Sequence, residues 1–170
     1  MKKKKNNLEK FKELPESSIL YLSVGAESPK VVEELRKEAV DVQWVEVYQP
    51  NSSFQGGLAL RDSLIGGEDA ARTEMTEAQL KETYLSHLKD LLDHMDIWNS
   101  LDLQSSKYVF PGEGKESALR ECYEDAKQLD VLEAKNYCIS GKRDEIVEYL
   151  EKTDISSILV DEVKLSELSN

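Results

Sequence analysis

Asn136-Tyr-Cys-Ile-Ser-Gly141 opens the stretch that decides the predicted fold, and it is followed by Lys142 to Lys152 and then by Ile155 to Val160. An apolar run ends at the glycine, a segment with helical spacing of its apolar residues follows, and a run rich in β-branched residues closes the stretch. This order is typical of a parallel strand–helix–strand crossover. The stretch therefore predicts an α/β protein.

The rest of the chain extends the same pattern. Ser18 to Val24 is a mostly apolar run that ends before a glycine, Val42 to Val47 is a second predicted strand, and Lys107 to Phe110 is a short third one. Five strands in a repeated strand–helix order predict a five-stranded parallel, doubly wound sheet with helices on both faces. This is the three-layer sandwich of Rossmann-like and flavodoxin-like proteins.

The chain length suits a single domain. We expect a basic tail and a short docking helix over residues 1–16, one α/β domain over residues 17–163, and a C-terminal tail over residues 164–170. Residues 49–72 are the least regular stretch, of the kind that forms functional or disordered loops. Thr76 and Gln79 form a capping-box pair, which predicts that a long helix runs from about Glu77 to Trp98.

Composition excludes some classes of partner. The 170 residues include 34 acidic and 22 basic ones, so the net charge is −12, which repels nucleic acid and anionic lipid. The basic start of the chain, Met1 to Lys5, lacks the apolar segment of a secretory signal, and no run is long enough to span a membrane. Cys122 and Cys138 are not in a Cys-x-x-Cys pair and are expected to be buried thiols. These features predict a soluble cytoplasmic protein.

In a parallel sheet, ligands bind beyond the carboxyl ends of the strands. Glycines in the predicted loops there leave backbone N–H groups free for an anion, although glycine is also the ordinary loop residue. The candidate binding residues are Gly25, Ser28, Gly112, Gly114, Lys115, Ser140, Gly141 and Lys142. The Gly112 loop is no Walker phosphate loop, because Val109 stands at the first glycine position and Glu116 at the Ser/Thr position.

Catalytic and metal-binding patterns are weak in this sequence. His87 and His94 are the only histidines, and two helical turns separate them by about 10.5 Å, too far for one ion. No glycine-flanked serine elbow occurs. The sequence predicts no catalytic set, no metal and no cofactor. The predicted core includes Ile19, Tyr21, Val45, Leu88, Leu91, Ile139 and Ile158.

The chain resembles the universal stress protein family. The likeness lies in Ile19-Leu-Tyr-Leu-Ser-Val-Gly25, in Val42 to Val47, in the long acidic helix, and in the segment from Gly141 to Val160. The resemblance implies the fold described above, a homodimer and a regulatory role in stress response.

The chain departs from that family at the nucleotide site. Nucleotide-binding members carry an aspartate that falls at or near Val24 here, and Asp144 replaces the second glycine if their glycine motif begins at Gly141. We therefore expect a regulatory protein that acts through protein–protein contacts, with an unidentified protein partner. The first alternative is a module that binds ATP or AMP, or hydrolyses it weakly, through the glycine loops. The second is an enzyme whose catalytic groups lie in residues 49–72.

Overall fold

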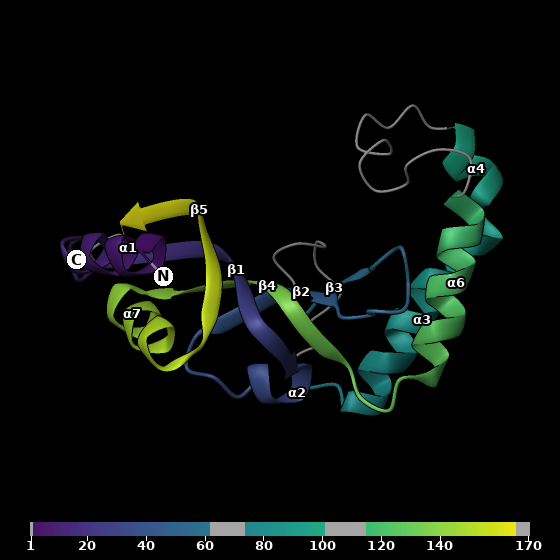
Figure 1. The fold of residues 1–170 in the computed structure, drawn as a ribbon, viewed down its shortest axis with the longest axis horizontal. Helices are drawn as coiled ribbons and strands as arrows, with labels where there is room; N and C mark the ends of the chain where they lie inside the picture. The colour runs from purple at the N-terminus through teal and green to yellow at the C-terminus, as the bar shows by residue number, and fades with distance from the viewer. Residues whose placement is uncertain (1, 62–73, 101–114, 166–170) are drawn as a thin grey trace.

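The computed structural model describes residues 2–61, 74–100 and 115–165, and in it one five-stranded sheet organises the chain (Figure 1). The strand order is β3-β2-β4-β1-β5, and every neighbouring pair is antiparallel. The strands are β1 (Ser18–Val31), β2 (Asp41–Val47), β3 (Gly57–Ala59), β4 (Glu133–Lys142) and β5 (Ile155–Leu165). The prediction of a parallel, doubly wound sheet is wrong, and the molecule has an α+β fold.

Most of the helices lie in two groups (Figure 1). The described helices are α1 (Lys2–Lys12), α2 (Val32–Leu35), α3 (Glu77–Asp93), α4 (Met95–Ser100), α6 (Lys115–Gln128) and α7 (Arg143–Lys152). Helices α1 and α7 pack together near β4, β1 and β5, whereas α3 and α6 pair with each other beyond the β3 end of the sheet. The sheet therefore has a helical layer on one side and a separate helical pair at one end.

Residues 136–160 do form a strand, a helix and a strand, as predicted. However, the two strands are not neighbours in the sheet, because β1 lies between them. β4, α7 and β5 follow each other in sequence, and β1 lies between β4 and β5, antiparallel to both. β4 and β5 thus run parallel without touching. In the same way, β1, α2 and β2 form a unit with β4 inserted between its strands. Two interleaved split units of this kind make the ferredoxin-like arrangement, here with β3 and the α3–α6 pair inserted between β2 and β4.

The two faces of the sheet differ in polarity. On the inner face, Leu20, Leu22 and Val24 of β1 are buried, and α7 covers them together with Tyr137 and Ile139 of β4. The residues between them point to the outer face, which polar and aromatic side chains occupy. One apolar and one mixed face is the pattern of antiparallel sheets that are solvated on one side.

The core confirms the predicted residues in part. Val45, Leu88 and Ile139 are buried, while Leu91 and Ile158 are half-buried against the core. Two predicted core residues, Ile19 and Tyr21, are only of intermediate exposure. Tyr21 lies opposite Ser140 on the outer face, because its neighbours Leu20 and Leu22 face the helices.

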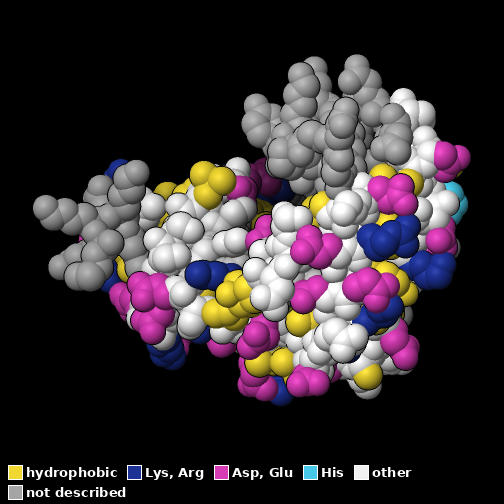
Figure 2. Space-filling view, turned by 45° about the vertical axis from the view of Figure 1, so that its right-hand side comes forward, with side chains coloured by type: hydrophobic (Ala, Val, Ile, Leu, Met, Phe, Trp, Pro, Cys, Tyr) yellow, Lys and Arg dark blue, Asp and Glu magenta, His cyan; other side chains and the backbone are white. Residues whose placement is uncertain are grey.

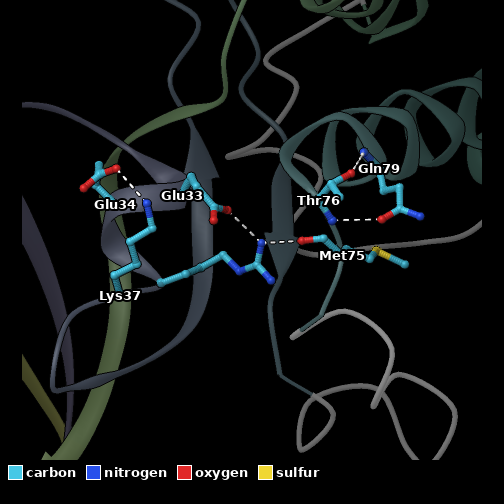
Figure 3. A network of polar contacts seen from close by, with 7 residues as sticks. Glu33, Glu34, Lys37, Met75, Thr76 and Gln79 are labelled. Atoms are coloured by element: carbon cyan, nitrogen blue, oxygen red, sulfur yellow. Dashed lines mark hydrogen bonds and ion pairs between the residues drawn. The ribbon is translucent and has the colours of Figure 1, made fainter.

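Arg36 links α2 to the start of α3 through hydrogen bonds to Glu33 and Met75, both labelled in Figure 3. Arg36 donates hydrogen bonds from Nη1 to Glu33 Oε2 at 2.9 Å and to the Met75 carbonyl at 2.6 Å. The next residue, Thr76, caps the helix: its Oγ1 accepts from Gln79 N, and Gln79 Oε1 accepts from Thr76 N at 2.8 Å. The predicted capping box is confirmed. The contact between Arg36 and the Met75 carbonyl holds the start of α3, and with it the helical pair, next to α2.

Several predicted boundaries change. Helix α1 begins at Lys2 and so includes most of the expected tail, and Leu165 extends β5 beyond residue 163. Ser28 does not cap a helix, because β1 continues to Val31. The predicted long helix ends at Asp93, and α4 follows it. The predicted strand at residues 107–110 lies outside the described residues, as does most of the second half of the 49–72 segment.

Candidate functional site

The outer face of the sheet carries an open hollow. Its central residues, Trp44 and Cys138, lie opposite each other on β2 and β4, and Ser23 of β1 lies on the other side of Cys138. Two adjoining hollows of about 580 and 280 Å³ share Trp44 and Cys138. The larger one is lined by Tyr21, Leu22, Gln43, Trp44, Cys138, Ile139, Asp161 and Glu162.

The polar groups of this face are already paired with each other. Ser23 Oγ donates to Asp161 Oδ2 at 2.7 Å, and Asn136 Nδ2 donates to Glu46 Oε1 at 2.8 Å. The Trp44 ring lies against β3, where a Cβ on Gly57 would be 2.3 Å from Trp44 Cζ2. Glu46, Asp161 and the neighbouring Glu162 place carboxylates on this face, of which Glu162 pairs with Lys164, and carboxylates disfavour phosphate.

Strand β5 forms one edge of the sheet. It pairs with β1 only, and in the described part of the chain its other edge has no strand beside it. Four large apolar side chains of β5 are exposed: Leu159 (64%), Val160 (40%), Val163 (44%) and Leu165 (67%). An exposed edge with apolar side chains can accept another extended segment through backbone hydrogen bonds.

A bulge divides β5 into two halves. Tyr21 pairs with Glu162 and Leu22 pairs with Val160, so Asp161 is the extra residue. Lys164 lies with its Nζ 4.9 Å from the centroid of the Tyr21 ring and 3.1 Å from Glu162 Oε2. Beyond the bulge, Glu162 and Lys164 therefore share the outer face, and Val163 and Leu165 share the inner one.

The predicted anion-binding residues do not meet at one rim. Gly25 lies within β1, between Asn136 and Ser157, and a Cβ there would be 2.5 Å from Ser157 Oγ, so glycine serves close strand packing. Gly141 pairs with Leu20, five residues from Gly25 along β1, or about 17 Å. The carboxyl ends of adjacent antiparallel strands lie at opposite ends of the sheet. The loops that follow these strands therefore do not meet, and the reason for expecting one shared binding site no longer holds.

The other candidate residues occupy strands or helix ends. Ser28 lies in β1, and Ser140 and Lys142 lie in β4, where Ser140 Oγ accepts from Gln43 Nε2 at 3.0 Å. Lys115 is the first residue of α6, and Gly112 and Gly114 lie outside the described residues. Among the candidates that the structure describes, only Ser140, Gly141 and Lys142 lie together, and these are consecutive in sequence.

Acidic side chains occupy the start of α7, next to the last of these candidates. Glu145 Oε2 accepts a hydrogen bond from the Lys142 backbone N–H at 3.0 Å, and Asp144 lies in the same helical turn. Arg143 is held by the Leu14 carbonyl at 2.6 Å and by the Asp144 carboxylate at 2.8 Å. These carboxylates stabilise the positive end of the helix dipole and compete with any phosphate for it.

A buried polar cluster, which no pattern in the sequence indicates, joins the sheet to the helical pair. Gln49 is fully buried and follows β2. Its Oε1 accepts from Tyr84 Oη at 2.6 Å and from Cys122 Sγ at 3.1 Å, and its Nε2 donates to the Cys122 carbonyl and to Asp125 Oδ2, both at 2.9 Å. Tyr84 Oη also accepts from Gly56 N at 3.1 Å. A glutamine at the end of a strand is too common in sequences to signal such a cluster.

The chemistry of this cluster is structural. Burial raises the pKa of the Cys122 thiol and also raises the pKa of the Tyr84 phenol. Both groups are therefore neutral near pH 7, so Cys122 lacks the thiolate that a nucleophile needs. The cluster satisfies the hydrogen bonds of its buried polar groups and fixes the segment around Gln49 and Gly56 between α3 and α6.

Thiol alkylation tests this assignment. In the folded chain at about pH 8, we expect iodoacetamide to modify Cys138 of the outer face much faster than Cys122. The raised pKa leaves less Cys122 thiolate at any given pH, and burial blocks access. Peptide mass spectrometry over time measures both rates, and in denaturant the two rates should converge. Faster modification of Cys122 in the folded chain would contradict the structural role.

The two histidines lie on α3 or at its end. His94 is the C-cap residue, and its Nδ1 lies 2.8 Å from the Asp90 carbonyl. No group of three or more His, Cys, Asp or Glu side chains suited to a metal occurs in the described ranges. The expectation that the chain binds no metal stays a prediction.

Comparisons with protein-family models, with curated proteins and with solved structures find no match to this chain. They therefore identify no family, and the fold implied by the resemblance to universal stress proteins is contradicted by the antiparallel sheet. None of the helices over residues 2–61, 74–100 and 115–165 is long and apolar enough to cross a membrane.

Proposed function

We propose that the chain is a non-catalytic regulatory protein that acts through contacts with other polypeptides, and that strand β5 is its contact surface. The observation that carries this proposal is the concentration of exposed apolar side chains on that strand. Of the six large apolar side chains that are exposed in the described part of the chain, four belong to β5. Clustered exposed apolar residues mark interaction sites, whereas scattered ones are ordinary.

The backbone of β5 supports the same proposal. Its free edge presents N–H and C=O groups that can pair with an added strand, which supplies affinity, while the side chains on either face supply specificity. Val160, Val163 and Leu165 face the side of α1 and α7, and Leu159 faces the outer hollow beside Ser23. An added strand would thus continue the sheet and cover both groups of apolar side chains.

The remaining chemistry of the molecule supports binding over catalysis. The buried Cys122 thiol is neutral, and the carboxylate of Glu145 occupies the start of α7. Figure 2 shows Asp and Glu side chains interspersed with Lys and Arg over the helical side of the molecule, with no continuous basic surface among the described residues of that face. The surface described there suits neither phosphate chemistry nor nucleic acid.

Site-specific photo-crosslinking in cells of the source organism tests the proposal. A photoreactive phenylalanine analogue at Leu165 is expected to give covalent adducts with a polypeptide held against β5. The matched control is the same analogue at Ile97, which is similarly exposed at 54% but lies on α4. Adducts with this chain or with another protein both support the proposal. If Leu165 gives no more adduct than Ile97, β5 is not the contact surface.

A further inference from the structure

We propose that the polypeptide bound at β5 is a second copy of this chain, and that the two β5 strands pair antiparallel about a two-fold axis at Val163. This inference rests on the proposed function, because it names the partner of the same surface. The result would be a continuous ten-stranded sheet across the dimer. Three features support this partner: the edge of β5 that has no strand beside it in the described residues, the symmetry of antiparallel pairing, and the order of charges along the strand.

The relevant segment is the half of β5 that follows the bulge. Glu162, Val163, Lys164 and Leu165 pair in regular register with Tyr21, Leu20, Ile19 and Ser18 of β1. Their backbone is therefore extended, and in the described structure no backbone hydrogen bond leaves their other edge. Leu165 (67%) and Val163 (44%) are both exposed on the inner face.

Symmetry restricts how two copies of this segment can pair. Residues directly opposite each other in an antiparallel pair point to the same face and have the same hydrogen-bonding state. Because both properties alternate along a strand, two identical strands pair regularly only when the two-fold axis passes through a residue position. The centres that leave at least one described residue of β5 on each side, from the bulge onward, are Asp161, Glu162, Val163 and Lys164.

Charge selects one of these centres. An axis at Asp161, Glu162 or Lys164 places that residue opposite its own copy, so two like charges meet, which destabilises a sheet. An axis at Val163 instead places Glu162 opposite Lys164 of the second copy, twice over. The two side chains share the outer face and are about half-exposed, at 51% and 53%, so both are available for this exchange. Val163 then meets its own copy on the inner face.

The pairing of Glu162 with Lys164 of the second copy also explains how a chain of net charge −12 could pair with itself. General repulsion between two acidic molecules opposes association, most strongly at low salt. Two Glu–Lys pairs at the contact offset this repulsion locally, and the apolar side chains beside them lose exposed surface. The strand thus carries a self-complementary sequence, Glu162-Val-Lys164, at its free edge.

Charge reversal tests the pairing directly. Sedimentation of the purified full chain, from low micromolar to millimolar concentration at physiological salt, should give a dimer. Glu162→Lys or Lys164→Glu alone replaces both attractive pairs with like charges, so each should weaken dimerisation at least about tenfold. A mixture of the two single variants restores both pairs and should form a heterodimer of near wild-type affinity. The double variant Glu162→Lys/Lys164→Glu should dimerise by itself for the same reason.

The controls separate local pairing from net charge and from folding. Glu34→Lys and Lys37→Glu change the net charge equally at an exposed ion pair of 3.0 Å on α2 and its end, and they should leave dimerisation unchanged. Circular dichroism and thermal melts establish that all variants fold. A monomeric wild type, or a dimer that the β5 variants leave unchanged, would overturn the inference. Adducts from Leu165 to a different protein would then still support the proposed function, whereas absence of any adduct would defeat both.

Discussion

Replacing Gln49 with leucine is expected to lower the free energy of unfolding by about 2–4 kcal/mol. Gln49 is fully buried and holds four hydrogen bonds, to Tyr84, to Asp125 and to both the thiol and the carbonyl of Cys122. Leucine has a similar volume but no polar atoms, so the cavity stays filled while several buried donors and acceptors lose their partner. Chemical denaturation monitored by circular dichroism measures the change.

The matched control for this substitution is Gln43→Leu. The Gln43 side chain donates a hydrogen bond from Nε2 to Ser140 Oγ at 3.0 Å, and it lies half-buried on the outer face, where water can replace the lost contact. Its loss should cost less than about 1 kcal/mol. Equal effects of the two substitutions would show that the cluster around Gln49 does not join the sheet to the helical pair.

Leu88→Ala is expected to lower the free energy of unfolding by about 2–5 kcal/mol. Leu88 is 2% exposed on α3 and belongs to the buried hydrophobic core, so alanine leaves a cavity there. Leu91, on the same helix, is half-buried, and Leu91→Ala should cost about half as much or less. Urea melts of both variants measure the difference. An equal cost at the two positions would contradict the orientation of α3.

The positions of many elements could be predicted from the sequence, because the signals are local. The capping box at Thr76 marks the first turn of α3, and Gly141 and Thr153 bound α7 to within two residues. The strands at Ser18 and Val42 also begin where their apolar runs begin, give or take a residue. Each of these signals depends on residues within one or two turns of each other, which the sequence displays directly.

The predicted parallel direction of neighbouring strands was wrong because the alternating run from Leu20 to Val24 was interpreted as a continuous apolar run. Leu20, Leu22 and Val24 alternate with Tyr21 and Ser23, which is the pattern of a strand with one solvated face. This alternation was a usable signal for an antiparallel sheet. It was outweighed by the strand–helix–strand order at the end of the chain, which parallel neighbours and a split unit share.

The candidate contact surface on β5 could not be predicted from the sequence. Ile158, Leu159 and Val160 form an apolar run of the kind found in buried strands, and the position of β5 at the edge leaves Leu159 and Val160 exposed. The self-complementary charges of Glu162 and Lys164 likewise acquire meaning only when the edge beside them is free. The buried cluster of Gln49, Tyr84 and Cys122 needs contacts between residues up to 73 positions apart.

By itself, the sequence determined where most helices and strands lie and the parallel direction of β4 and β5, because these follow from periodicity and from the crossover that α7 provides. It did not determine which side of β1 is buried, since Ile19 and Tyr21 were predicted in the core and lie on the outer face. Only the tertiary structure decided that β1 lies between those strands and that β5 lies at the edge. Pairing between distant strands depends on which buried faces fit together across the whole core, and many orders satisfy the same local pattern. The order of the strands, and with it the exposed edge, is therefore a property of the packed molecule.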